Sequence, residues 1–358
     1  MSNGFKKKMM SELSQLVIPL IALAILILFN LIRDPGFFGI GVAVNNDGNR
    51  VLTGNLISII DSASELAIIA MGMTLVTAAC GGQDISVGAV GAISGAVFVK
   101  MIQAMGGINA GTFAVALLLA IVVTICFKLF NGTLVSVFRI QPMIATLILY
   151  SCGRSIAYWI NGDATPQLTS PILTAIGMTI PGIPVPTPIF CVLLVGLLLA
   201  LIFRFTNISL YTQSVGINQG AARLNGINPI VIKLLSFVLL GVCVSVASLI
   251  GISRLGQLNH KTLLVDIEMD AILAVAIGGN NLGGGKFKLS GSILGAYIIQ
   301  MLTTTLYAMK VSPVNVKAYK AIVIIIIVIA GSPVVKEKVT ALWKKLRSSG
   351  AAIRKEVG

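Results

Sequence analysis

Residues 234–252 read LLSFVLLGVCVSVASLIGI, and no charged side chain interrupts them. An α-helix needs about 20 apolar residues to cross roughly 30 Å of hydrocarbon, and this stretch has that length. Backbone amides in lipid must find their hydrogen-bond partners within the protein. The stretch is therefore predicted to be a transmembrane helix.

Similar apolar stretches lie on both sides of it. Only 11% of the 358 residues are charged and 56% are hydrophobic, whereas about a quarter of a soluble protein is charged. The stretches are continuous, which excludes an outer-membrane barrel, whose strands alternate. The sequence predicts an all-α polytopic membrane protein with about ten transmembrane helices, some broken by glycine. The predicted segments are 13–32, 56–80, 86–105, 110–127, 142–160, 186–203, 234–252, 268–280, 289–309 and 318–335.

The basic residues orient these segments. The net charge is +14, and most Lys and Arg residues lie in short loops and tails between apolar stretches. With the amino terminus inside, most of them face the cytoplasm, including Lys128 and Arg139 in a predicted inner loop. We expect a cytoplasmic tail at 1–12, a membrane domain at 13–335 and a basic cytoplasmic tail at 336–358. No aromatic residues are interleaved with the basic ones, so nucleic-acid binding is not expected.

Few side chains are suited to catalysis or metal binding. The five cysteines lie in or near apolar stretches without a CxxC pair, and His260 is the only histidine. We expect buried thiols, no metal, no cofactor and no catalytic site. One acidic cluster, Asp266, Glu268 and Asp270, falls on a predicted outer loop. It has no histidine partner, so a solvated helix start is favoured over a membrane enzyme.

The first unusual segment is residues 80–88, CGGQDISVG, which separates two apolar stretches. An ionised Asp84 at the centre of a bilayer costs about 2.5–3.5 kcal/mol on insertion scales. Two interpretations remain open. Asp84 and Ser86 begin a helix at an ordinary interfacial turn, or a broken helix with Gly81 and Gly82 lines the path of a polar solute.

The second segment is residues 277–286, IGGNNLGGGK. A phosphate-binding loop ending at Lys286 requires glycine at 280 and Ser or Thr at 287, but Asn280 and Phe287 stand there. No nucleotide site is expected. The glycines match those of the first segment in register, which suggests an internal repeat. The path residues of this segment are predicted to be Gly278, Gly279, Asn280 and Asn281.

The third segment lies in the predicted inner loop 204–233. Residues 218–225 are predicted to form a short helix that ends at Gly226 in the left-handed C′ position, with Pro229 beyond. A helix with one small-residue face suits docking into a groove of a partner protein, and an amphipathic helix on the membrane surface is the alternative. The docking residues are predicted to be Gly220, Ala221, Ala222, Arg223, Leu224 and Gly226.

These segments carry a family resemblance. GGQDISVGAVGAISG, GINQGAARLNGINP and EMDAILAVAIGGNNLGGGKFKLSGSILGAYIIQ closely resemble the ribose/xylose/galactose-type permeases of bacterial ABC importers, over residues of about 50 to 335. The last of the three is especially similar to galactofuranose-type permeases. Two residues depart from the family pattern: Gln83 stands where Ile is usual, and Gly220 where an acidic residue is common. The second departure bears on the coupling contact.

The resemblance implies a ten-helix permease subunit in the bacterial cell membrane, which forms the path of a monosaccharide and has no enzymatic activity of its own. It implies ATPase subunits docked on the inner loops, a second permease subunit, which can be identical or different, and a periplasmic or lipid-anchored sugar-binding protein outside. Membrane lipid surrounds the assembly.

A secondary, ion-coupled transporter is the alternative function. It requires a coupling-ion site in the membrane, for which Asp61 and Glu65 are the best candidates because they lie one helical turn apart. Both also fall in the first turns of a predicted helix, where carboxylates are favoured for structural reasons alone.

Overall fold

The computed structural model describes residues 2–44, 50–162, 165–168 and 170–331. Its secondary structure consists of helices and one β-hairpin. The elements are α1 (Ser2–Arg33), β1 (Gly41–Val44), β2 (Arg50–Thr53), α2 (Asn55–Ser62), α3 (Ser64–Cys80), α4 (Val87–Ala104), α5 (Ala110–Ser136), α6 (Pro142–Asn161), α7 (Pro171–Gly177), α8 (Thr187–Phe205), α9 (Ile208–Ile217), α10 (Gln219–Leu224), α11 (Pro229–Leu255), α12 (Ile267–Ile277), α13 (Leu289–Ala308) and α14 (Pro313–Gly331).

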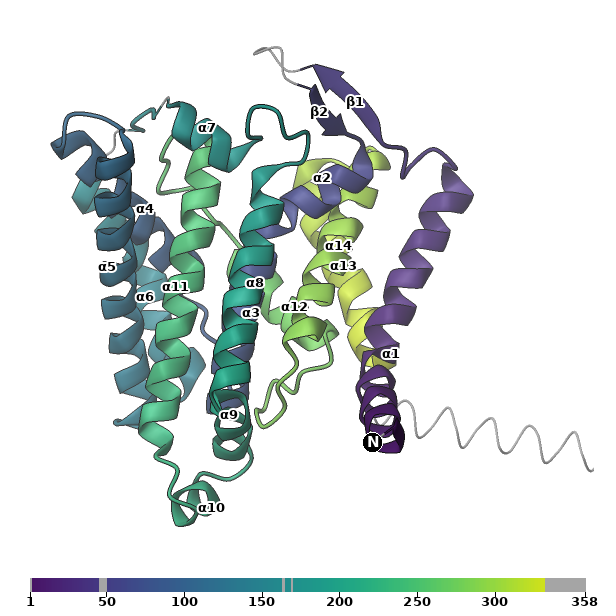
Figure 1. Ribbon diagram of the computed structural model, residues 1–358, viewed down its shortest axis with the longest axis vertical. Helices are drawn as coiled ribbons and strands as arrows, with labels where there is room; N and C mark the ends of the chain where they lie inside the picture. Colours follow the sequence, from purple (N-terminus) through teal and green to yellow (C-terminus); the bar gives the residue numbers. More distant parts are fainter. Residues whose placement is uncertain (1, 45–49, 163–164, 169, 332–358) are drawn as a thin grey trace, which may run out of the picture.

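The helices run between two ends of the molecule, as Figure 1 shows. One end carries the hairpin β1–β2 and α7, and we call it the hairpin side. The other end carries α10, and we call it the α10 side; the start of α1 lies toward it. Within the described residues, seven helices are long and apolar enough to cross a membrane. The chain is therefore a polytopic α-helical membrane protein.

Each of the ten predicted segments overlaps a helix of the structure, but several boundaries were wrong. The segment predicted at 110–127 continues to Ser136 as α5. Helix α1 begins at Ser2, earlier than the segment predicted from residue 13; the cytoplasmic tail predicted at 1–12 stays a prediction. The predicted loops contain the unpredicted elements β1–β2, α7 and α9. The tail predicted at 336–358 lies outside the described residues.

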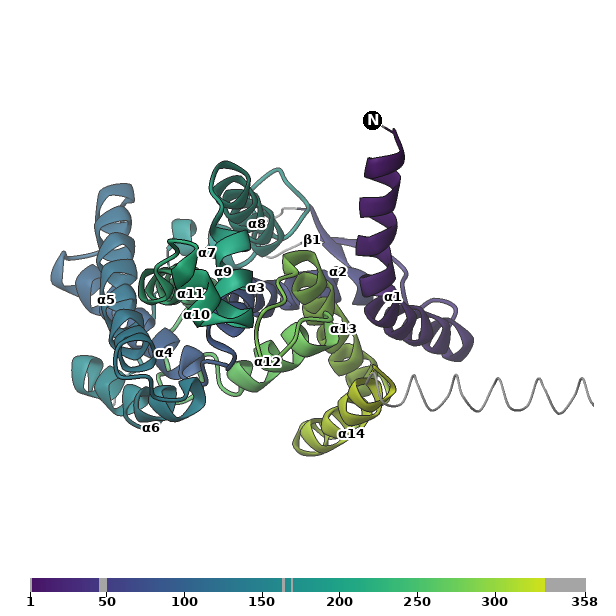
Figure 2. The ribbon, with the colours of Figure 1, turned by 90° about the horizontal axis from the view of Figure 1, so that it is seen from below.

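Helix α3 forms the centre of the fold. Every residue of α3 except Cys80 is buried, and α8, α9, α11, α12 and α13 all pack against it. Figure 2 shows α3 surrounded by the other helices in the view from the α10 side. The cysteines are free, and only Cys243 is fully buried while Cys126 is exposed. The prediction that all five thiols are buried was therefore wrong.

Glycines allow neighbouring helices to touch through their backbones. A Cβ atom at Gly295 of α13 would lie 2.1 Å from the Ala274 carbonyl oxygen of α12, and one at Gly278 would lie 2.3 Å from the Gly291 carbonyl carbon. Membrane helices associate largely through close packing of this kind, because lipid is as apolar as the side chains. The α12–α13 pair therefore depends on its small residues.

This packing predicts a contrast between two glycines inside membrane helices. Gly295→Ala forces Cβ into the α12 backbone and is expected to destabilise the protein by about 1–3 kcal/mol, as overpacking does. Gly196→Ala in α8 is the matched control, because its Cβ would meet only the Met71 sulfur at 3.7 Å. The measurement is the thermal unfolding midpoint in detergent; equal midpoints for the two variants would contradict the packing argument.

Candidate functional site

A fully buried ion pair lies where α3 turns into α4. The Lys128 Nζ atom of α5 lies 2.8 Å from Asp84 Oδ2, and both side chains have 0% exposure. Lys128 also donates to Ser86 Oγ at 3.0 Å, and Asn131 Nδ2 donates to the same oxygen at 2.9 Å. Four polar side chains thus form one closed network between the α3–α4 turn and α5.

Local interactions fix the turn that carries Asp84. Gly81 ends α3 in the left-handed conformation, with φ 64°, which favours glycine. Asp84 Oδ1 accepts hydrogen bonds from the backbone N–H of Ser86 at 2.7 Å and from its hydroxyl at 2.6 Å. The Ile85 N–H donates to Thr146 Oγ1 of α6 at 3.1 Å. The turn is therefore held to both α5 and α6.

The structure corrects the prediction for Lys128. It was assigned to an inner loop, but it lies inside α5 with its ammonium group enclosed by protein. The signal that could have identified it was its position within a long apolar segment, with Asn131 three residues further along the same helix face. An ionisable residue inside a membrane helix requires a partner, and Asp84 was the other intramembrane charge in need of one.

Neither interpretation of Asp84 describes the turn fully. Asp84 and Ser86 are both 0% exposed, so neither lines an open path in this conformation. The turn is also more than an interfacial helix start, because the carboxylate is paired with a buried lysine. Breaking one partner of a buried pair costs about 3–5 kcal/mol. The network therefore locks the α3–α4 turn in place.

The second glycine segment lies directly against the first. The Gly285 N–H donates to the Ala78 carbonyl at 3.0 Å, and Gln83 Nε2 donates to the Leu282 carbonyl at 2.8 Å. A Cβ atom at Gly81 would lie 2.8 Å from the Gly283 carbonyl oxygen, and one at Gly82 would lie 2.8 Å from Pro142 Cγ. Gly81 thus allows the two turns to meet, and Gly82 allows the first turn to pack against α6. The proposed internal repeat stays a prediction.

The predicted residues of the second segment shape the α12–α13 turn. Asn280 is buried, donates to Ser292 Oγ at 2.9 Å and accepts from the Lys288 N–H at 2.6 Å. Asn281 is exposed and closes a small loop by accepting from the Gly283 N–H. Gly278 is buried and is the C-cap residue of α12, and Gly279 follows it with φ 81°. These residues hold a turn in position.

The short helix predicted at 218–225 is present as α10, and its ends are formed as expected. The Asn218 side chain accepts from the Ala221 N–H at 3.0 Å, and Gly226 has φ 77°. Arg223 is exposed and Leu224 is 92% exposed, whereas Ala222 is buried against Val215 of α9 and Ile232 of α11. Ala222 therefore anchors α10 to the protein and does not lie on its outer surface.

The candidates for an ion-coupling site are already paired. Arg254 of α11 lies 3.1 Å from Asp61 Oδ1 and 3.5 Å from Glu65 Oε1. It also donates to the Asp61 backbone carbonyl. The two carboxylates thus tie α2 and α3 to the end of α11, which is a structural role that does not require a bound ion.

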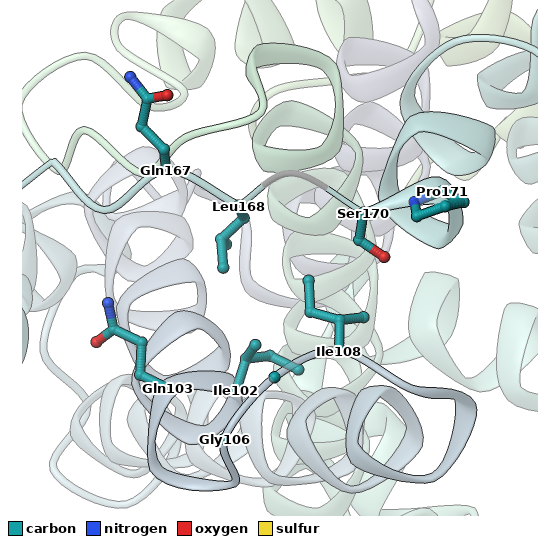
Figure 3. A pocket seen from close by; sticks show the side chains of 9 residues that line it. Ile102, Gln103, Gly106, Ile108, Gln167, Leu168, Ser170 and Pro171 are labelled. Carbon is teal, nitrogen blue, oxygen red and sulfur yellow. The ribbon is translucent and has the colours of Figure 1, made fainter.

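A hollow of about 530 Å³ opens on the hairpin side (Figure 3). Gln103 and Gln167 lie on one side of it, and Ser170 and Pro171 lie on the other. None of the residues that line it is ionisable. Its amides and hydroxyl can donate and accept hydrogen bonds, so the hollow suits polar contacts and not acid–base chemistry.

The buried pair predicts an effect that a second substitution reverses. Lys128→Met leaves the Asp84 carboxylate uncompensated and is expected to lower the free energy of unfolding by about 3–5 kcal/mol. Asp84→Asn added to Lys128→Met removes that charge and keeps an oxygen for the Ser86 N–H, so it should restore most of the loss. Stability is measured by thermal unfolding in detergent.

Lys100→Met, at an exposed position of α4, is the control and should unfold near the parent temperature. Asp84→Leu should leave membrane insertion intact, because it removes a charge from the membrane, but should lower stability and uptake. If the Lys128→Met protein unfolds at the same temperature as the parent, the pair does not lock the turn.

Comparison with known proteins places this architecture in a family. Residues 55–331 match the family described as "Branched-chain amino acid transport system / permease component". The galactofuranose transporter permease protein of Escherichia coli is 36% identical, with 92% of each chain covered. The fructose import permease protein of Bifidobacterium longum is 34% identical over 92% of this chain and 91% of its own. The ribose import permease protein of Escherichia coli is 32% identical over 87% and 91%.

No solved structure matches the chain. The family match covers both glycine turns and α10, which the sequence singled out, and the buried ion pair, which only the structure revealed. The chain is a translocating subunit and not an enzyme, and it belongs to the permease-component family of bacterial ABC importers.

Proposed function

We propose that this permease carries a monosaccharide across the cell membrane and that separate ATPase subunits drive it. The named relatives support a sugar as the solute, since they are permeases for galactofuranose, fructose and ribose. The observation that carries the coupling part of the proposal is α10, a short helix that projects from one end of the molecule (Figure 1).

The proposed topology has ten crossings, with both termini and the α10 side in the cytoplasm. Helices α1, α2–α3, α4, α5, α6, α8, α11, α12, α13 and α14 supply the crossings. The hairpin side then faces outward, where a periplasmic or lipid-anchored binding protein delivers the sugar. An even number of crossings places both termini on one side, and the basic tail favours the cytoplasm.

The exposed residues of α10 suit a protein partner. A leucine with 92% exposure at the tip of a helix is an apolar group without an intramolecular role. Arg223 precedes it and is also exposed. Gly220 and Ala221 carry no large side chain, so no bulky group projects from the helix beside Arg223 and Leu224. Gly226 ends the helix, and Ala222 fixes it to α9 and α11. We propose that the ATPase binds Leu224 and Arg223 in a groove on its own surface.

The glycine segments are proposed to support the path from behind. Gly81, Gly82, Asp84 and Ser86 hold one turn, and Gly278, Gly279, Asn280 and Asn281 hold the other. Their mutual contact is supported by the bond from Gly285 to Ala78. A rigid pair of turns at the end of α3 and α12 would keep the helices that border the path in register while the subunits move.

The energy source distinguishes the proposal from an ion-coupled transporter. The permease is reconstituted in proteoliposomes with its ATPase and binding protein, and uptake of labelled ribose, fructose and galactose is measured. Uptake that requires internal ATP and persists without an ion gradient supports the proposal. Uptake driven by a proton or sodium gradient without ATP would overturn it, and recovery of chemically altered sugar would point to an enzyme.

The coupling contact predicts a local effect of Arg223→Glu. The variant should insert normally but bind the ATPase about 30-fold more weakly or worse, because losing one side of a buried charge contact costs about 2–5 kcal/mol. Lys100→Glu reverses an exposed charge at the opposite end of the protein and should leave binding unchanged. The measurements are co-purification of the ATPase and sugar-stimulated ATP turnover.

Leu224→Asp should weaken binding in the same way, since it places a charge on the exposed tip. Ala222→Trp is expected to detach α10 from α9 and α11 and so to lower stability as well as coupling. Normal complex formation by both Arg223→Glu and Leu224→Asp would show that the ATPase binds elsewhere.

A further inference from the structure

A groove lies between α8 and α13. Both helices pack against α3, and they leave a hollow of about 950 Å³ between them. Figure 2 places α8 at one edge of the molecule, with α6 and α14 toward the opposite edge. Several residues that line the hollow, Leu193 and Leu197 among them, are exposed. The groove is therefore open to the surroundings of the helix bundle.

The walls of the groove are apolar along most of their length. Helix α8 contributes Leu193, Gly196 and Ala200, and α13 contributes Leu289 and Ile293. On each helix these residues are three or four positions apart, so they lie on one face. Gly196 has no side chain and Ala200 has only a methyl group. The wall formed by α8 therefore leaves room for an apolar chain that runs along the helices.

Two cationic residues line the groove at its α10-side end. Arg204 is exposed in the last turn of α8, and Lys288 is the N-cap residue of α13. Phe203 and Phe287 directly precede them in the sequence, and the two rings meet edge to face with 5.1 Å between their centroids. This aromatic contact keeps Arg204 and Lys288 at the same end of the groove.

The charge at this end of the groove is positive. None of the residues that line the hollow is Asp or Glu, and within the described residues no carboxylate forms an ion pair with Arg204. The backbone of Lys288 is fixed, because its N–H donates to Asn280 Oδ1 at 2.6 Å and its carbonyl accepts from Asn280 Nδ2 at 3.0 Å. Ser290 adds an exposed hydroxyl beside the two cations. This end of the groove is therefore suited to an anion.

The length of the groove matches one leaflet of a bilayer. Val192 is the lining residue of α8 furthest from Arg204, and at 1.5 Å per residue the two lie about 18 Å apart along the helix. Half of a hydrocarbon core of about 30 Å is about 15 Å. A molecule whose charged group lies at Arg204 and whose acyl chains lie in the same leaflet therefore fills the groove from end to end.

An ordinary interfacial cation does not account for this arrangement. Lys and Arg are common at the cytoplasmic ends of membrane helices, where they orient the protein. That role requires neither a groove nor a second basic residue on a neighbouring helix. Here cations from two helices meet at the end of one apolar groove, and basic pockets of this kind between membrane helices bind anionic lipid headgroups.

We propose that the groove binds one anionic phospholipid from the leaflet on the α10 side. The headgroup phosphate contacts Arg204 and Lys288, with charge-assisted hydrogen bonds from the guanidinium group. The acyl chains lie along the apolar walls. A zwitterionic headgroup carries a cation of its own, which the two basic residues repel, so the site selects for net negative charge. The inference depends on the membrane location of the chain and not on the solute that it carries.

Such a lipid would join two segments that meet beneath α3. Helix α8 ends at Phe205, and the chain continues directly into α9 and α10. Lys288 belongs to the α12–α13 turn, where a Cβ atom at Gly285 would lie 2.6 Å from Ile217 Cγ1 of α9. A lipid held by both cations connects α8 to this turn. Because a ligand that binds only the folded protein stabilises it, the lipid should raise the unfolding temperature.

The test titrates the purified permease, without partner proteins, with phosphatidylglycerol or phosphatidylcholine in detergent. The apparent affinity comes from the rise of the thermal unfolding midpoint with lipid concentration. The parent should bind phosphatidylglycerol at least about fivefold more tightly than phosphatidylcholine, and Arg204→Gln should lose about fivefold of that affinity, which is the contribution of one basic residue near anionic lipid. Arg139→Gln removes another exposed cation, from the loop after α5 and outside the groove, and should bind like the parent.

A second pair of variants tests the apolar part of the groove. Ala200→Phe fills the groove without changing charge and should weaken phosphatidylglycerol binding. Leu198→Phe enlarges an exposed side chain of the same helix that does not line the groove, and should leave binding unchanged. Glycerol phosphate carries the anionic group without acyl chains and should not shift the midpoint.

Three results would overturn the proposal. The first is equal affinity of the parent for the two lipids, and the second is unchanged phosphatidylglycerol binding by either Arg204→Gln or Ala200→Phe, which would place the lipid elsewhere on the surface. The third is an equal shift by glycerol phosphate, which would indicate a site for a soluble anion. Since no ATPase or sugar is present, the result is independent of whether the permease transports a sugar.

Discussion

The closed pairing of Asp84 with Lys128 is the constraint on which the rest of the structure depends. Two charges buried at 0% exposure are tolerated only together and only with their remaining hydrogen bonds satisfied. The pair fixes the α3–α4 turn to α5, and the Ile85 bond to Thr146 fixes it to α6. The position of the α3–α4 turn then determines where Gly81 meets the α12–α13 segment. One ionic contact thus positions helices from both halves of the chain.

Much of this architecture could be predicted because its determinants are local. Continuous apolar stretches located the seven helices that are long and apolar enough to cross a membrane within the described residues, since length and hydropathy suffice to identify such helices. The count of ten crossings stays a prediction. The ends of α10 were predictable from Asn218, Gly226 and Pro229, because caps act through neighbouring backbone groups. The glycine segments were recognisable from composition alone, and Gly81, Gly278 and Gly284 lie where the backbones of two segments meet.

The missed features are non-local. Lys128 directly follows the predicted segment 110–127, where a long side chain can also extend to the interface. The long apolar segment around it could have indicated a place in the membrane, but nothing nearby in the sequence identifies the partner that buries it. Its partner lies 44 positions away and is brought close only by the fold. Ala222 was assigned to the outer face of α10, because nothing in its neighbours shows that α9 exists to cover it. The sequence did not indicate which face of α6 is exposed, because that depends on how α4 packs against the helix.

Helix α11 connects α10 with the hairpin side of the molecule. It begins at Pro229, just beyond α10, and it ends at Leu255, where the loop to α12 begins. Ser245 and Ser248 tie it to α4 through Ser94 Oγ and the Gly91 carbonyl, and Arg254 ties its end to Asp61 and Glu65. A helix held at several depths moves as a rod together with α3 and α4. A displacement of α10 by an ATPase would therefore reach the loop 256–266 after α11 by rigid movement of a packed unit, without requiring the buried pair to open.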